Sequence, residues 1–337
     1  MITIQEIREV HLELTTRCNA SCPLCPRNFF GYPHNAGYPD TELRLADIEK
    51  IFNPEFIGQL DNVKINGNLG DFILAHDGIE IVEYFRRHNS KNKIDISTNG
   101  SGRNHDYWTR LAQSKPVVRF ALDGLEDTHA LYRQDTSFAR ILKNASAFIK
   151  AGGEAVWKMV LFDHNAHQIV QAKMLSRELG FSNFELVHHG RDKGPVYSRQ
   201  GSLERTLGKP KFSPPEQVIT FMNNISWHNS TKRYFHNRVP ASALNCQTMS
   251  KIKTIYIAAD GSVYPCCWTG FFPRTYSANF MQGNDQIKNL LGDFDNNALN
   301  RPLQECLLWF SKIQQAWNLE TYDQGRPFIC DSNCSKY

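Results

Sequence analysis

The chain has 337 residues, of which 41% are hydrophobic and 21% charged, and its formal net charge is +4. This composition is typical of a folded globular protein, and so small a charge favours no nucleic-acid partner. The sequence contains no apolar run of about 18 residues or more, and its first residues lack the apolar core of a signal peptide. We therefore expect no membrane association and a cytoplasmic location.

The first half of the chain alternates between strand-like and helix-like runs. Six strands are predicted, at residues 9–14, 62–68, 93–98, 117–124, 154–162 and 183–189. Helices are predicted between them, at residues 77–88, 108–114, 138–153 and 167–181. Such alternation is typical of parallel strands joined by right-handed crossovers, either in an open sheet or in a full or partial barrel. In both architectures the functional groups gather beyond the C-terminal ends of the strands.

The second half is less regular. Residues 196–245 are rich in Pro, Gly and Ser and are predicted to form a connector with a helix at residues 214–228. Residues 253–268 predict a β-hairpin turning at Asp260 and Gly261. The expected organisation is therefore a core at residues 1–195, a connector at 196–245 and a small α+β domain at 246–337.

The nine cysteines form two groups at opposite ends of the chain. Cys18, Cys22 and Cys25 are spaced C-x3-C-x2-C, and the other six fall within the last 92 residues. Because thiols stay reduced in the cytoplasm, both groups indicate metal sites rather than disulfides. Three thiolates are one ligand short of a closed zinc site, whereas a 4Fe-4S cluster bound by three keeps one iron open to another ligand. A zinc site completed from elsewhere in the chain is the alternative.

The C-x3-C-x2-C motif, placed directly after the first predicted strand, resembles that of the radical S-adenosylmethionine (radical SAM) enzymes. The resemblance implies an α/β fold, a partial (β/α)6 barrel of parallel strands. It also implies a radical-generating 4Fe-4S cluster on the three cysteines, with S-adenosylmethionine on the open iron. An external one-electron reductant such as flavodoxin or ferredoxin would reduce the cluster. Cleavage of the cofactor would then give a 5′-deoxyadenosyl radical that abstracts a hydrogen atom from the substrate.

Segments after the later strands are similar to the cofactor-binding motifs of that family. The residues implied to bind the cofactor are Gly67, Gly70 and Asp71 of "GNLGD", Ser97 and Asn99 of "STNG", and Arg133. Asp71 would meet the methionine amino group, and Arg133 would meet its carboxylate. The sequence departs from the family pattern at Ala121, where a serine is common, and at Leu24, where an aromatic residue is usual.

Two further residues are candidates for catalysis. His188 ends the sixth predicted strand and could act over the substrate as a base or a hydrogen-bond donor. Asp123 follows the fourth strand and could be either a cofactor contact or a turn former.

The C-terminal cysteines resemble the SPASM and twitch extensions of radical SAM enzymes. The predicted ligands of a second, auxiliary 4Fe-4S cluster are Cys246, Cys266, Cys330 and Cys334. Four ligands would close the cluster and make it an electron carrier, although four cysteines also suit zinc. Neighbours on a strand point to opposite faces, so only one of Cys266 and Cys267 should face the cluster. Cys306 lies in an apolar helical stretch and is predicted to be a buried structural thiol.

The predicted function is that of an oxidoreductase carrying out a net two-electron oxidation of a small molecule, by dehydrogenation or bond formation. Peptide modification is the alternative, and it is ranked second because only about nine residues precede the first strand, too few for a domain that grips a leader peptide. A zinc-binding module without enzymatic activity is the alternative of another class.

Overall fold

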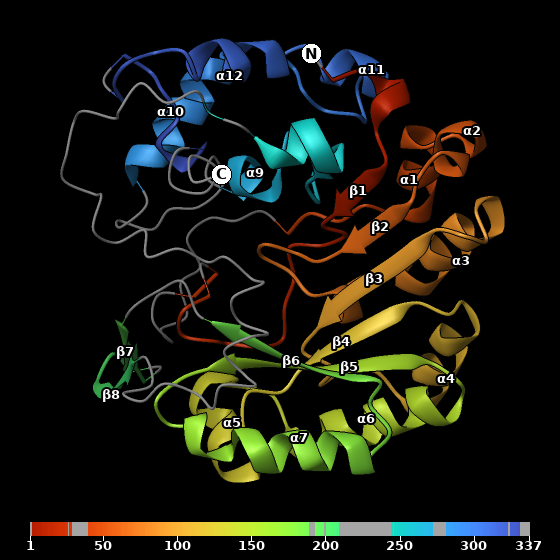
Figure 1. Ribbon diagram of the computed structural model, residues 1–337, viewed down its shortest axis with the longest axis vertical. Helices are drawn as coiled ribbons and strands as arrows, with labels where there is room; N and C mark the ends of the chain where they lie inside the picture. The colour runs from red at the N-terminus through yellow and green to blue at the C-terminus, as the bar shows by residue number, and fades with distance from the viewer. Residues whose placement is uncertain are drawn as a thin grey trace.

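The computed structural model describes residues 2–25, 27–28, 40–188, 193–198, 200–208, 244, 246–271, 281–322 and 324–330. Its centre is an eight-stranded sheet in the order β10-β9-β1-β2-β3-β4-β5-β6, with helices along one face (Figure 1). All neighbouring strands from β9 to β6 run parallel, and β10 is antiparallel to β9. The prediction of an α/β fold built on six parallel strands is confirmed.

The strands of the central sheet lie within the predicted ranges. They are β1 (Glu9–Leu12), β2 (Asn62–Ile65), β3 (Lys93–Thr98), β4 (Val117–Ala121), β5 (Glu154–Leu161), β6 (Asn183–His188), β9 (Thr254–Ile257) and β10 (Val263–Tyr264). The helices of the core are α1 (Leu45–Ile51), α2 (Pro54–Gly58), α3 (Gly78–His88), α4 (His105–Gln113), α5 (Glu126–Tyr132), α6 (Phe138–Lys150) and α7 (Ile169–Glu178). Those of the C-terminal part are α9 (Cys267–Phe271), α10 (Met281–Leu291), α11 (Leu303–Cys306) and α12 (Phe310–Ala316).

Local sequence signals set the ends of the core helices. The Ser137 hydroxyl accepts a hydrogen bond from the Arg140 amide at the start of α6, and Gly152, with a φ of 88°, follows its end. The Asn104 side chain caps α4 in the same way, accepting from the Tyr107 amide.

None of the described helices has the length and apolar character needed to cross a lipid bilayer.

The sheet face opposite the helices carries paired charges. Lys64 on β2 pairs with Glu9 on β1 at 2.9 Å. Arg119 on β4 pairs with Glu185 on β6 at 3.0 Å and also with Asp95 on β3. Because alternate residues of a strand face opposite sides, the apolar residues between these charges pack beneath the helices.

The predicted hairpin around Asp260 and Gly261 is confirmed as β9 and β10. It does not stand apart from the core, because β9 pairs in parallel with β1, from Glu9 opposite Thr254 to Leu12 opposite Ile257. The hairpin thereby satisfies the backbone groups along the outer edge of β1. Residues from the first and third predicted units therefore share one sheet.

The predicted connector begins with strands that the sequence reading missed. The antiparallel strands β7 (Lys193–Tyr197) and β8 (Leu203–Gly208) form a second, two-stranded sheet, and the predicted boundary at residue 195 falls inside β7. This part of the chain is rich in Pro, Gly and Ser, residue types that favour turns. Because Pro and Gly are also depleted in strands, the sequence did not indicate the hairpin. The helix predicted at residues 214–228 lies outside the described residues.

Candidate functional site

The loop after β1 brings its cysteines into one apolar environment. Cys22 is buried, Cys18 and Cys25 are half-buried, and the Cys25 amide donates to the Cys22 carbonyl at 3.0 Å. The three thiols belong to or pack against one apolar group, whose other buried members are Ala20, Leu24, Tyr132, Phe162, Val196 and Leu207. Val196 lies on β7 and Leu207 on β8, so the unpredicted hairpin contributes to the same apolar group as the cysteine loop.

Burial disfavours the charged form of these thiols. It raises the pKa of Cys22 to about 11, although the nearby Arg133 guanidinium opposes the shift. It also raises the pKa of Cys18, with a smaller contribution from the charge of Asp71. Thiolates in such a place need strong positive charge beside them, which metal coordination supplies.

The donor set fits an iron–sulfur cluster. No group of three or more His, Cys, Asp or Glu side chains that could hold a metal ion occurs in the described part of the chain. A single metal ion draws its ligands into one tetrahedron, whereas the thiolates of a cubane each bind a different iron. Three thiols on one loop in an apolar setting suit a cubane, in which each thiolate binds a different iron.

The segments that follow the C-terminal ends of β1, β2, β3 and β4 form the rim of the sheet, and polar groups on the first, third and fourth of these rim segments reach the sulfur atoms. The side-chain amide nitrogen of Asn99 lies 3.9 Å from the Cys18 sulfur, and the Ala20 backbone amide donates to the same sulfur at 3.4 Å. A guanidinium nitrogen of Arg133 lies 3.8 Å from the Cys22 sulfur. Donors of this kind stabilise thiolates and tune the potential of a bound cluster.

Gly67 and Gly70 let the second rim segment approach the cysteine loop closely. A Cβ atom on Gly70 would lie 1.7 Å from the Thr15 carbonyl oxygen, and one on Gly67 would lie 2.4 Å from the Gly70 carbonyl oxygen. Both obstacles are backbone atoms that cannot turn aside. These glycines are therefore required for the packing of "GNLGD" against the start of the cysteine loop.

Asp71 links the second and third rim segments. Its carboxylate accepts hydrogen bonds from the Thr98 hydroxyl at 2.6 Å, the Asn99 amide at 2.7 Å and the Ile73 amide at 3.2 Å. The side chain is buried, and burial raises its pKa. Both carboxylate oxygens already have partners here, which the sequence motif did not indicate. Ser97 lies opposite Arg119 in the β3–β4 register.

Asp123, one of the two predicted catalytic residues, is 0% exposed. One of its oxygens is 2.5 Å from Nε of Arg133, and the other accepts from the Val160 amide at 2.5 Å. The carboxylate therefore holds Arg133 in place and offers no exposed oxygen to a substrate. Arg133 also lies over the Tyr132 ring, 5.2 Å from its centroid.

His188, the other predicted catalytic residue, is the last residue of β6 and lies opposite Leu161 in the register. Its backbone position at the rim agrees with the sequence reading. The placement of its side chain lies outside what the structure describes.

Sequence reasoning missed Glu13, which lies between β1 and the cysteine loop. Its side chain is 0% exposed and accepts from the Leu69 amide at 2.6 Å, the Gly70 amide at 3.3 Å and the Tyr256 hydroxyl at 2.8 Å. Glu13 thus joins the cysteine loop, the glycine segment and β9. A carboxylate in an apolar strand is the signal that could have identified it.

The C-terminal cysteines are partly described. Cys246, Cys266 and Cys330 are buried, and Cys334 lies outside the described residues. Burial raises the pKa of Cys266, and the charge of the nearby Cys246 adds to this effect. The sulfurs of Cys246 and Cys266 contact the hydroxyls of Thr248 and Thr269, at 2.8 and 3.6 Å.

The prediction that strand alternation turns only one of Cys266 and Cys267 towards the cluster is wrong. Strand β10 ends at Tyr264, and Cys267 begins α9, so the alternation of strand faces does not apply to either cysteine. Cys306 is 0% exposed within the apolar core, as predicted for a structural thiol.

No protein-family model matches the sequence, and no curated protein matches it either. The fold is similar to that of Streptococcus suis SuiB bound to S-adenosylmethionine, with a TM-score of 0.55 and 15% identity over 86% of this chain and 66% of SuiB. It is also similar to native anSMEcpe with bound AdoMet and the Cp18Cys peptide, with a TM-score of 0.55 and 17% identity over 97% and 87% of the two chains. The chain therefore shares its fold with these two proteins, both of which have been solved with S-adenosylmethionine bound.

Proposed function

We propose that the protein is a radical SAM enzyme, an oxidoreductase that reductively cleaves S-adenosylmethionine to a 5′-deoxyadenosyl radical and abstracts a hydrogen atom from its substrate. One observation carries this proposal. A fold shared with AdoMet-bound enzymes gathers Cys18, Cys22 and Cys25 in an apolar environment beyond β1, next to the segments that resemble cofactor-binding motifs.

The chain's own residues would hold and shield the cofactors. Cys18, Cys22 and Cys25 would bind a 4Fe-4S cluster, which supplies the electron that cleaves S-adenosylmethionine. Asn99 and Arg133 would donate N–H groups to the thiolates. The apolar side chains around the loop would exclude water, which protects radical intermediates.

The proposed reaction is a net two-electron oxidation. Cys246, Cys266, Cys330 and Cys334 would bind an auxiliary 4Fe-4S cluster that accepts the second electron. A small molecule is the first candidate substrate. A peptide is the second, and the neighbours favour it, because SuiB has been crystallised with its precursor peptide SuiA and anSMEcpe with peptides.

The radical-generating site is tested on the full chain after anaerobic reconstitution with iron and sulfide. We expect about eight irons per chain for two cubanes, and 5′-deoxyadenosine on addition of S-adenosylmethionine and dithionite. Combined Cys18→Ala, Cys22→Ala and Cys25→Ala substitution should abolish 5′-deoxyadenosine formation and remove about half of the iron. The Cys306→Ala variant is the control and should retain both. Persistent cleavage in the triple variant would refute the assignment, and a colourless protein containing zinc would support a binding module instead.

The substrate class is tested by hydrogen transfer. Short peptides encoded beside the gene would be prepared with deuterium and incubated with the active enzyme. Deuterium in 5′-deoxyadenosine identifies a peptide substrate, whereas its absence for every such peptide favours a small molecule.

A further inference from the structure

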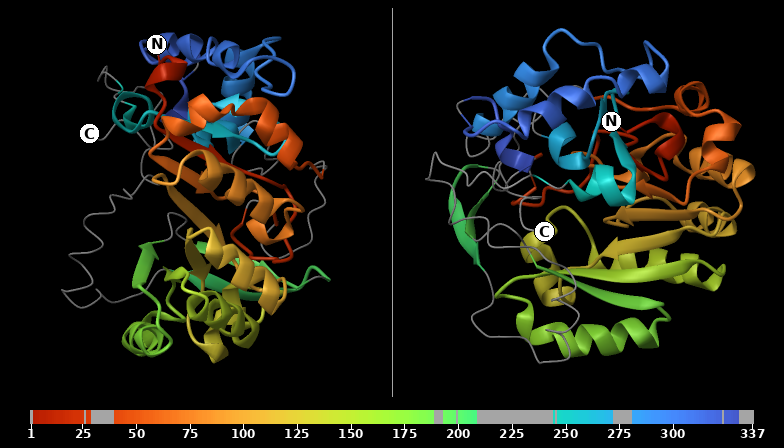
Figure 2. Two further views of the ribbon diagram at one scale, coloured as in Figure 1. Left: turned by 90° about the vertical axis from the view of Figure 1, so that its right-hand side faces the viewer. Right: turned by 45° about the horizontal axis from the view of Figure 1, so that its top comes forward.

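Lys158 is a half-buried cation in the middle of β5. Its neighbours Trp157 and Met159 belong to the apolar core beneath the helices. Since successive residues of a strand face opposite sides, Lys158 lies on the other face of the sheet. In the left view of Figure 2 the helices α1 to α4 lie in front of the strands, so this other face is turned away from the viewer.

The residues around Lys158 on this face offer it no free anion. They are apolar on three sides and acidic on the fourth: Val156 and Val160 on the same strand, Ala121 on β4 and Glu185 on β6. Nε of Arg119 already donates to both oxygens of the Glu185 carboxylate, at 3.2 and 3.0 Å. No hydrogen bond or ion pair joins the Lys158 ammonium group to another residue that the structure describes.

The next carboxylate, that of Asp123, is also engaged. It lies 2.5 Å from Nε of Arg133, and its second oxygen accepts from the Val160 amide at 2.5 Å. Burial lowers the pKa of Lys158, the charge of Glu185 opposes this shift, and the charge of Arg133 adds to it. An ammonium group that is largely withdrawn from water and has no bound carboxylate is stabilised by an anion from outside the chain.

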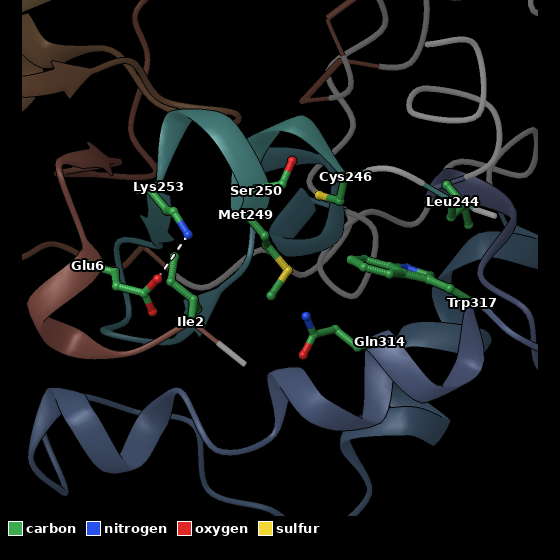
Figure 3. A pocket seen from close by; sticks show the side chains of 9 residues that line it. All are labelled: Ile2, Glu6, Leu244, Cys246, Met249, Ser250, Lys253, Gln314 and Trp317. Atoms are coloured by element: carbon green, nitrogen blue, oxygen red, sulfur yellow. Dashed lines mark hydrogen bonds and ion pairs between the residues drawn. The ribbon is translucent and has the colours of Figure 1, made fainter.

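Two other lysines show the usual arrangement. Lys64, on the same face of the sheet, pairs with Glu9 at 2.9 Å. Lys253, near the N-terminus, pairs with Glu6 at 3.0 Å, which the dashed line in Figure 3 marks. Each of these cations has a carboxylate of the chain as its partner, and Lys158 does not.

Lys158 lies on the side of β5 that leads to the cysteine loop. Val160, two residues closer to the rim, packs against the same apolar group as Cys18 and Cys25. Two residues of a strand span about 6–7 Å. A molecule with an anionic group at Lys158 would therefore extend along Val160 towards the cysteine loop.

We propose that Lys158 binds a carboxylate group of the substrate. This inference rests on the proposed function, because it places the rest of the substrate at the radical-generating site, and it narrows the substrate to a class, that of organic acids. Since Lys158 supplies one positive charge and Arg119 is already engaged, a carboxylate fits better than a phosphate group, which carries a charge of about −1.5 to −2.

Binding is tested by NMR on the full chain, with ¹³C at Cε of its lysines and without S-adenosylmethionine or reductant. The signal missing from Lys158→Gln identifies Lys158. Propionate should shift this signal saturably. Propionamide, which has the same size but no charge, should bind at least about tenfold more weakly, a difference of about 1.4 kcal/mol.

Matched variants show whether the effect belongs to Lys158. Lys158→Gln should weaken propionate binding at least about tenfold in calorimetry, and Lys158→Arg, which keeps the charge, should restore most of it. Lys64→Gln is the control, because Lys64 lies on the same face but already has Glu9 as its partner, and this variant should bind propionate like wild type.

Two further ligand pairs distinguish the sources of the carboxylate. Hexanoate and hexanamide represent a small acid, and the end-blocked tripeptides Ala-Glu-Ala and Ala-Gln-Ala represent an acidic peptide. The acidic member of each pair should bind more tightly than its amide, and the tighter of the two acids identifies the source.

Two outcomes would overturn the proposal. In the first, propionate leaves the Lys158 signal unmoved while the protein stays folded, and Lys158 then only balances the two carboxylates, Asp95 and Glu185, that share Arg119. In the second, Lys64→Gln weakens propionate binding as much as Lys158→Gln does. Both are measured without cofactor cleavage, so 5′-deoxyadenosine formation decides the proposed function separately.

Discussion

The hydroxyl of Tyr256 donates a hydrogen bond of 2.8 Å to the buried carboxylate of Glu13, which lies 243 positions earlier in the chain. This bond connects the C-terminal hairpin to the base of the cysteine loop. Glu13 also accepts from the backbone of the glycine segment, so three distant parts of the sequence meet at one side chain.

The Tyr256→Phe variant should therefore be markedly destabilised. It leaves a buried carboxylate short of one donor, which costs about 1–3 kcal/mol of unfolding free energy. Tyr84→Phe is the matched control, because the Tyr84 hydroxyl donates to the neutral Phe52 carbonyl at 2.9 Å, and its loss should cost only about 1 kcal/mol. Urea denaturation measures both. If both variants lose the same free energy of unfolding, the buried Glu13 carboxylate does not depend on the Tyr256 hydroxyl for its stabilisation.

The Gly70→Ala variant should disturb the cysteine loop. The added methyl group would overlap the Thr15 carbonyl, and because the obstacle is backbone on both sides we expect a loss of about 3 kcal/mol or more, together with reduced iron incorporation. Gly58→Ala provides the comparison, since a Cβ there meets nothing within 4 Å. An iron content for Gly70→Ala that matches wild type would show that the close approach is dispensable.

The buried His129 should make stability depend on pH. Burial lowers its pKa from 6.5 to about 4. Between these pH values the unfolded chain binds a proton at His129 that the folded chain does not bind. Neutral His129 therefore makes its full contribution to the free energy of unfolding above pH 6.5, and this contribution is lost as the pH falls towards 4. From pH 7 to pH 5, wild type should lose about 1–2 kcal/mol more than His129→Gln in urea unfolding.

The exposed His105 gives the control for this prediction. Its side chain is 66% exposed, so His105→Gln should follow the pH dependence of wild type. The prediction is wrong if His129→Gln and wild type lose the same free energy over this interval.

The proposed auxiliary cluster can be removed separately from the first. The Cys330→Ala variant should lose about half of the iron while still forming 5′-deoxyadenosine, because the cluster on the first loop remains. Cys306→Ala should keep its full iron content, since Cys306 lies in the apolar core. Iron analysis and product assays on both variants check this, and loss of iron from Cys306→Ala would place that thiol among the ligands.

Local signals in the sequence predict most of the secondary-structure elements and the order of the rim segments. Strand–helix alternation placed β1 to β6 and most of their helices, since the period of apolar residues and the capping residues are local signals. It also placed the cysteine motif directly after β1, because the direction of parallel strands fixes which end each loop occupies.

Only the tertiary structure shows which residues are partners in strand pairing, packing, hydrogen bonds and ion pairs. Strand β9 pairs with β1, and strands β7 and β8 contribute to the apolar group around the cysteine loop. Glu13 accepts a hydrogen bond from Tyr256, and Asp123 is buried against Arg133 rather than exposed at the rim. In each of these pairings the two segments are far apart in the sequence, and the residues around one segment do not indicate its partner. Burial makes such a partner necessary. Each buried polar group without a hydrogen-bond partner costs about 1–3 kcal/mol of unfolding free energy, and an unpaired buried charge costs more.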